Sequence, residues 1–138
     1  MKVLLDTNII MDALQERAPF DVHAKQILKI AQDKSKLVCS FTVNATTDIF
    51  YLYSKARDVR AAKVALEFLL AQYEVVSITH EDCCAALALA TLEYEDALVA
   101  ICAEKAGVDY IVTRDEMFLN ADLKIRTITP KALVNMLI

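Results

Sequence analysis

The sequence predicts an α/β fold, a three-layer sandwich in which helices flank both faces of a parallel sheet of about five strands. Short, unbroken apolar runs alternate with longer segments of helical periodicity, and strands that are apolar throughout are typical of parallel sheets covered on both faces. The chain has 138 residues, 57% of them hydrophobic and 25% charged, which suffices for one domain with its own core. We therefore expect a single domain over residues 1–138.

The first half of the chain contains three predicted strands and four predicted helices. The strands are the apolar runs 2–5, 37–40 and 74–78. The helices cover 8–15, 21–34, a segment that Thr42 caps and that runs through Tyr53, and 59–72. The segment 21–34 is amphipathic because Ala24, Ile27, Leu28 and Ala31 recur on one face, which indicates a helix lying on the sheet.

The second half continues the same alternation. It contains predicted helices over 81–92 and 95–106, a strand over 110–113, a weaker strand over 125–128 and a final helix that begins at Pro130. Gly107 stands where a left-handed residue commonly ends a helix. Proline is favoured in the first helical turn, where its missing N–H group has no partner to lose.

Charge and composition exclude several classes of protein. The net charge of −4 counts against a protein that binds nucleic acid mainly through a basic surface, but not against a nuclease whose acids hold metal ions. The four cysteines include no C-x-x-C pair, so we expect neither a disulfide framework nor a structural zinc site. No apolar run approaches the ~18 residues that span a bilayer, and Asp6 interrupts the first apolar stretch. We therefore expect a cytoplasmic protein with no membrane segment and no signal peptide.

Mean hydropathy is +0.36, which is high for a chain of this length. It predicts more apolar surface than one core can hide, and exposed apolar patches commonly mark interfaces. Because two-fold dimers are the commonest assemblies, we expect a homodimer.

Four aspartates come from four separate segments that the predicted fold brings to one edge of the sheet. Asp6 follows the first strand and Asp115 follows the fourth, and ligands bind outside the carboxyl ends of parallel strands. Asp96 begins an apolar helix that can pack beside the first strand, and Asp48 lies in the helix after the second strand. Four carboxylates at one edge repel one another unless a cation lies between them. Mg²⁺ or Mn²⁺ fits this arrangement, because both ions prefer oxygen ligands.

Each aspartate taken alone has a simpler interpretation. Asp6 could cap the first helix, since D-T-N is a good capping sequence. Asp96 could do the same for its helix, where the neighbouring Glu95 weakens any argument from charge alone. Asp115 could lie in a solvated turn and Asp48 on an exposed helix face. Capping does not explain why acids end two apolar strands at the same edge.

Two segments carry a family resemblance, LLDTNIIMD at 4–12 and YEDALVAICAEKAGVDYIVTRDEMF at 94–118. They resemble the PIN-domain nucleases, in particular the toxin ribonucleases of VapC-type toxin–antitoxin pairs, and the resemblance covers the whole chain. It implies that Asp6, Asp96 and Asp115 bind metal and that Asp48 occupies the place of a family acid that is commonly Glu. Thr113 matches the family's hydroxyl residue. Polar residues that support the site are expected at Thr7 and Asn8, beside Asp6.

The resemblance implies a Mg²⁺- or Mn²⁺-dependent endoribonuclease with an RNA substrate and a cognate antitoxin. Two metal ions would bind the scissile phosphate and activate a water. A second hypothesis is a catalytically silent PIN-like interaction module, supported only by the shorter side chain of Asp48. A third is a phosphatase with Asp6 as nucleophile, although such enzymes usually carry D-x-D and here the third residue is Asn8. The only basic concentration, Lys55, Arg57, Arg60 and Lys63, is either a solvated helix face or a rim that guides RNA.

Overall fold

A five-stranded parallel sheet forms the middle layer of the computed structural model, which describes residues 1–89 and 91–138. The strand order is β3-β2-β1-β4-β5, and every neighbouring pair is parallel. The strands are β1 (Lys2–Leu5), β2 (Val38–Thr42), β3 (Glu74–Val76), β4 (Tyr110–Val112) and β5 (Arg126–Ile128). The predicted α/β sandwich with a five-stranded parallel sheet is confirmed.

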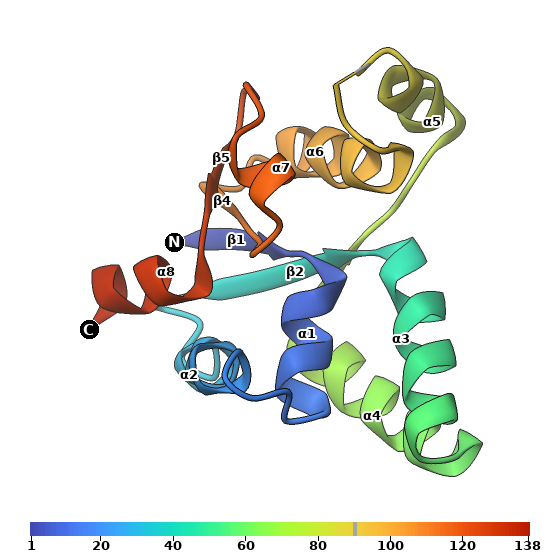
Figure 1. Ribbon diagram of the computed structural model, residues 1–138, viewed down its shortest axis with the longest axis vertical. Helices are drawn as coiled ribbons and strands as arrows, with labels where there is room; N and C mark the ends of the chain where they lie inside the picture. Colours follow the sequence, from blue (N-terminus) through green and yellow to red (C-terminus); the bar gives the residue numbers. More distant parts are fainter. Residues whose placement is uncertain (90) are drawn as a thin grey trace.

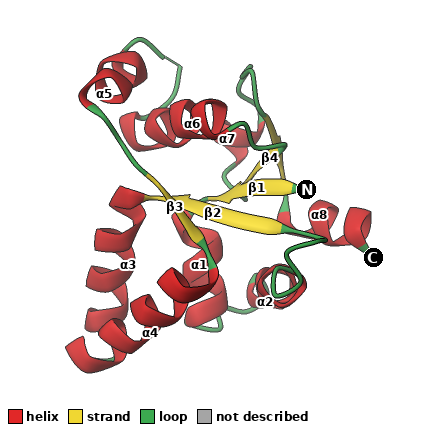
Figure 2. Ribbon diagram, turned by 180° about the vertical axis from the view of Figure 1, so that it is seen from behind, coloured by secondary structure: helices red, strands yellow, loops and turns green. Residues whose placement is uncertain are grey.

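Helices cover both faces of this sheet (Figures 1 and 2). One face carries α1 (Thr7–Leu14), α2 (Asp21–Ile30), α3 (Val43–Ala56), α4 (Val59–Gln72) and α8 (Pro130–Leu137). The other carries α6 (Tyr94–Ala106) and α7 (Glu116–Leu119), with α5 (His80–Leu87) packed on α6. In the described part of the chain, no helix is long and apolar enough to cross a membrane.

Alternation along β1 supplies both cores. Val3 and Leu5 point into the larger core with α1–α4 and α8, whereas Leu4 points into the smaller core with α6 and α7. All three side chains are at most 1% exposed. Burial of one aliphatic side chain of this size stabilises the fold by roughly 1.5–3 kcal/mol. The first strand is therefore fixed from both sides, and with it the position of Asp6.

Several predicted boundaries differ from the structure. The helix predicted over 21–34 ends at Ile30, because the Asp33 carboxylate accepts hydrogen bonds from the N–H and hydroxyl of Ser35 and closes a turn. The helix predicted over 81–92 ends at Leu87, and residue 90 of that segment lies outside the described residues. The short helix α7 was not predicted, because four residues are too few for a periodic pattern. Gly107 has φ +66° at the end of α6, as predicted.

Candidate active site

A cavity of about 340 Å³ opens at the carboxyl ends of β1 and β4 and is lined by six acidic residues. They are Asp6, Asp48, Glu93, Glu95, Asp96 and Asp115, and the remaining lining residues are Thr7, Asn8, Tyr51 and Leu52. The structure therefore brings the four predicted aspartates into one cavity, together with two further acids. None of these lining residues is basic.

Asp6 follows β1 and lies at the centre of the site. Its backbone N–H donates to the carbonyl of Val112 at 3.0 Å, which ties the end of β1 to the end of β4. Asp6 occupies the N-cap position of α1, but its side chain makes no capping hydrogen bond. Burial raises the pKa of Asp6, as does the charge of Asp115, while hydrogen bonds from the Thr113 hydroxyl and the Thr7 N–H act in the opposite direction. The carboxylate of Asp6 thus lines the cavity and does not cap α1 through the later N–H groups that an N-cap side chain normally binds.

Thr113 joins the acids that follow β1 and β4. Its side chain is fully buried, and its hydroxyl donates to Oδ2 of Asp6 at 2.9 Å. The hydroxyl oxygen of Thr113 in turn accepts a hydrogen bond from the backbone N–H of Asp115 at 3.1 Å. Oδ1 of Asp115 accepts the N–H groups of Met117 and Phe118 and so caps α7. Asp115 is therefore both a helix cap and a member of the cavity.

The acids of α6 enter the cavity from the opposite side of the sheet. Asp96 lies in the first turn of α6, and the N-cap residue is Glu93, so Asp96 itself caps nothing. Burial raises the pKa of Asp96 to about 6, with further contributions from the charges of Asp6, Asp115 and Glu93. The surroundings of Asp96 therefore destabilise the ionised form of its carboxyl group relative to the protonated form.

Glu95 is a site residue that the sequence analysis missed. Burial of its carboxyl group raises the pKa of Glu95 to about 7, and a hydrogen bond donated to Asp48 contributes next. The charges of Asp48, Asp6 and Asp96 act in the same direction. Near neutral pH, the Glu95 carboxyl group is therefore protonated in part of the molecules. Three acids within four residues at the start of a helix, Glu93, Glu95 and Asp96, were the available signal.

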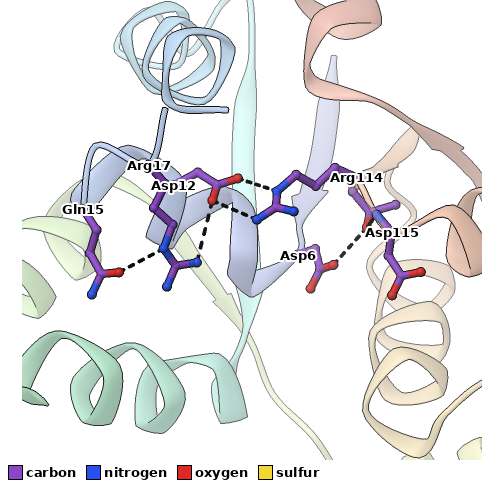
Figure 3. Close-up of polar contacts among 7 residues, drawn as sticks. Asp6, Asp12, Gln15, Arg17, Arg114 and Asp115 are labelled. Carbon is purple, nitrogen blue, oxygen red and sulfur yellow. Dashed lines mark hydrogen bonds and ion pairs between the residues drawn. The ribbon is translucent and has the colours of Figure 1, made fainter. Parts of the chain in front are cut away.

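Arg114 lies between the cavity and a buried aspartate (Figure 3). Its Nε donates to Oδ2 of Asp12 at 2.7 Å and its Nη2 donates to Oδ1 at 3.1 Å. Asp12 is only 1% exposed, and Arg17 approaches it at 3.7 Å. The guanidinium group also lies 4.1 Å from the centre of the Phe20 ring. The hydrogen bonds to Asp12 thus keep the guanidinium group of Arg114 near the acid cavity but outside its lining.

The sequence contained a signal for this ion pair too. Asp12 interrupts a run of buried residues in α1, and a buried carboxylate requires a partner. The cluster of basic residues noted in the sequence does not belong to this ion pair. Its four members are exposed around the turn between α3 and α4, namely Lys55, Arg57, Arg60 and Lys63. None of these four lines the acid cavity.

The donor set of the cavity fits a divalent cation. Carboxylate oxygens are the ligands that Mg²⁺ and Mn²⁺ prefer, and the pKa values of Asp6, Glu95 and Asp96 are raised mainly by burial and further by the neighbouring negative charges. Within residues 1–89 and 91–138, no group of three or more His, Cys, Asp or Glu side chains is already arranged so that it could hold a metal ion. Mg²⁺ usually keeps several waters and binds only one or two carboxylates directly, so an open site suits it.

The model of the PIN-domain family matches residues 2–117, and the chain belongs to this family. Comparison with curated proteins gives no match. VapC20 of Mycobacterium tuberculosis, described as a Sarcin-Ricin loop cleaving toxin, has a TM-score of 0.71 and 17% identity over 90% of this chain and 98% of that one. VapBC-1 of nontypeable Haemophilus influenzae has a TM-score of 0.71 and 14% identity over 95% and 99%. PAE2754 of Pyrobaculum aerophilum has a TM-score of 0.64 and 22% identity over 99% and 95%. The predicted PIN-domain, VapC-like fold is confirmed.

We predict that Arg114→Met lowers the free energy of unfolding by about 3 kcal/mol, because it leaves the buried carboxylate of Asp12 without its bidentate partner. Methionine keeps the apolar bulk of the side chain, so the loss reports the charge. Arg17→Ala is the matched control and should cost only about 0.5 kcal/mol, since Arg17 is the more distant arginine. Urea unfolding measures both, and equal losses would contradict the assigned role of Arg114.

We also predict that, in chelator, the free energy of unfolding rises as the pH falls from 8 to about 5. The pKa values of Asp96 and Glu95, about 6 and about 7, exceed their ordinary values of 3.8 and 4.5, so the folded state binds protons in this window before the unfolded state does. Asp33 and Asp82, whose pKa values are lowered, stay ionised there.

The variant Asp96→Asn should flatten this pH dependence and be at least as stable as the wild type at pH 8, because it removes one repelling charge. Urea unfolding at several pH values provides the measurement. A wild type that is more stable at pH 8 than at pH 5.5 would refute the repulsion on which this prediction rests.

Proposed function

We propose that this protein is an endoribonuclease that hydrolyses RNA phosphodiester bonds with Mg²⁺ or Mn²⁺, and that it is the toxin of a toxin–antitoxin pair. The observation that carries the proposal is the cavity of six acids without a basic lining residue, at the carboxyl edge of the sheet in a PIN domain. An acidic cavity repels phosphate unless cations lie between them. A divalent cation would therefore both bind the carboxylates and allow an RNA phosphate to approach them.

Asp6, Asp96 and Asp115 would hold one ion, and Asp48 would contribute to a second. When bound, the ion would orient the scissile phosphate and lower the pKa of a coordinated water. The Thr113 hydroxyl keeps Oδ2 of Asp6 in a fixed orientation and fixes the backbone of Asp115. Glu95, whose pKa is raised to about 7, is partly protonated near neutral pH, and a bound cation would displace that proton, so metal binding should release protons and strengthen as the pH rises.

The antitoxin is proposed on two grounds. The VapBC structures of Haemophilus influenzae and Salmonella typhimurium share this fold, and the latter is described as DNA-bound. In this chain, an open groove of about 580 Å³ along α3 and α4 combines the apolar side chains of Val64 and Phe68 with Arg57 and Arg60. An amphipathic segment of a partner protein, apolar and acidic, would complement such a groove.

The test is incubation of the purified protein with mixed RNAs in Mn²⁺, Mg²⁺ or chelator. We expect cleavage with either ion and none in chelator. Asp6→Asn and Asp96→Asn should abolish cleavage, because an amide is nearly isosteric with a carboxylate but a poor metal ligand. Asp48→Glu should keep or increase activity, since it restores the residue common in the family.

Melting curves separate failure of metal binding from failure of folding. Mn²⁺ should raise the melting temperature of the wild type by several degrees and leave Asp6→Asn almost unmoved. A raised melting temperature without cleavage of any RNA would favour the silent interaction module. Undiminished cleavage in excess chelator would exclude the metal-dependent mechanism.

A homodimer is the proposed assembly in the absence of an antitoxin. Four apolar side chains on α4 are about half exposed, namely Val59, Val64, Phe68 and Leu70. We predict that sedimentation velocity detects a dimer, and that Val64→Asp shifts it toward monomer by placing a charge in the contact. Only monomer at high micromolar concentration of the wild type would count against the dimer.

A further inference from the structure

A second cavity, of about 310 Å³, adjoins the acid cavity across the loop that follows β4. Arg114 lines the second cavity, and the next residue, Asp115, lines the first. The remaining lining comes mainly from α2 and α8 and the residues just before them, with Phe20, His23, Pro130 and Lys131 among them. We propose that this cavity binds one unpaired nucleotide of the RNA strand, next to the phosphate held at the acids. The proposal rests on the ribonuclease function proposed above and names a subsite for that substrate.

Charge distinguishes the two cavities. The first has six acidic lining residues and no basic one, whereas the second has Arg114, Lys131 and His23 and no acidic one among its described lining. Asp12 neutralises part of the charge of Arg114 from beneath, but Asp12 is shared with Arg17, so two guanidinium groups face one carboxylate. The second cavity therefore offers a phosphate the cationic partners that the first cavity lacks.

The apolar part of the lining suits a nucleobase. Phe20 is 45% exposed although it is aromatic, and the Arg114 guanidinium stacks over its ring. Unpaired RNA bases stack on aromatic rings and on guanidinium planes, and proteins that bind single strands combine such platforms with positive charge. A cavity of this volume lies at the lower end of the range for ligand pockets and has room for one base and its sugar, not for a duplex.

Continuity along the loop links this subsite to the reaction. Arg114 lines the second cavity and Asp115 lines the first, and the Cα atoms of these consecutive residues are about 3.8 Å apart. The two cavities are therefore close enough for one RNA strand to occupy both. The loop is held in place on both sides, by Thr113 bound to Asp6 and by Arg114 bound to Asp12. An acidic protein segment would also satisfy the charge. The exposed aromatic ring beside the guanidinium favours the nucleotide.

The experiment measures binding of a fluorescein-labelled, single-stranded oligoribonucleotide of mixed sequence by anisotropy, at low salt in chelator, so that binding reports the second cavity and not an ion held at the acids. Phe20→Ala should weaken binding roughly tenfold through loss of stacking, and Lys131→Ala about threefold through loss of one phosphate contact. Phe20→Tyr keeps a ring and should bind as the wild type does. Val22→Ala and Lys29→Ala, exposed positions on the same helix as His23 but outside the cavity, are the matched controls and should also bind unchanged.

Cleavage of the same RNA in Mn²⁺ adds a second readout. Phe20→Ala should raise KM and leave kcat unchanged, because the ring contacts substrate without touching the acids. If the wild type binds and cleaves RNA but Phe20→Ala and Lys131→Ala bind it equally well, the subsite is refuted and the ribonuclease function stands. If the wild type neither binds nor cleaves any RNA, both proposals fail. If a polyglutamate peptide displaces the RNA as well as unlabelled RNA does, the cavity belongs to an acidic protein segment and the nucleotide is excluded.

Discussion

The carboxyl ends of β1 and β4 lie side by side at one edge of the sheet, and an aspartate follows each strand closely. In a parallel sheet this juxtaposition is unavoidable, because neighbouring strands end at the same edge. At an effective dielectric constant of about 20, two unit charges roughly 6 Å apart repel by about 3 kcal/mol. Four further acids reach the same cavity from α3, from α6 and from the N-cap position of α6. The folded chain must therefore carry a concentration of like charge at the carboxyl edge of its sheet, and much of the surrounding structure can be understood as a response to that charge.

Three local arrangements moderate the repulsion without abolishing it. The Thr113 hydroxyl donates to Asp6, the N–H groups of α7 donate to Asp115, and Glu95 is partly protonated near neutral pH because its pKa is raised to about 7. Arg114 is near enough to lower the pKa of Asp6 slightly, yet its two hydrogen bonds go to Asp12. Had Asp12 been apolar, the guanidinium would have had the acids as its nearest partners and could have closed the cavity with an internal ion pair. The buried aspartate of α1 thus keeps the site available to an external cation. Binding such a cation to the folded state alone also stabilises that state, so charge that destabilises the free domain favours the loaded one.

The sheet could be predicted from sequence because its determinants are local: each strand is a short apolar run, and each run is bounded by a clear helical pattern. The convergence of Asp6 and Asp115 followed from the same pattern, since strand ends fix where the next residue lies. Glu95 and the Asp12–Arg114 pair could not be placed in this way. Their roles depend on side chains that meet across 47 and 102 positions of sequence, and such contacts leave no periodic trace. The simpler interpretation of Asp115 was a solvated turn, but one of its carboxylate oxygens caps α7 while the residue also lines the cavity.

The facing positions of Asp48 and Glu95 bear on the departure from the family pattern. The resemblance implies that the acid of α3 is commonly Glu, and Asp48 is one methylene shorter. On its own, this shortening would draw a carboxylate back from the cavity and weaken any second metal site. Glu95 extends from α6 far enough to donate a hydrogen bond to Asp48, so a carboxyl group still occupies the space between the two helices. The longer side chain of Glu95 therefore lies beside the shorter one of Asp48, and both carboxyl groups line the same cavity. A substitution at either position changes the geometry of both.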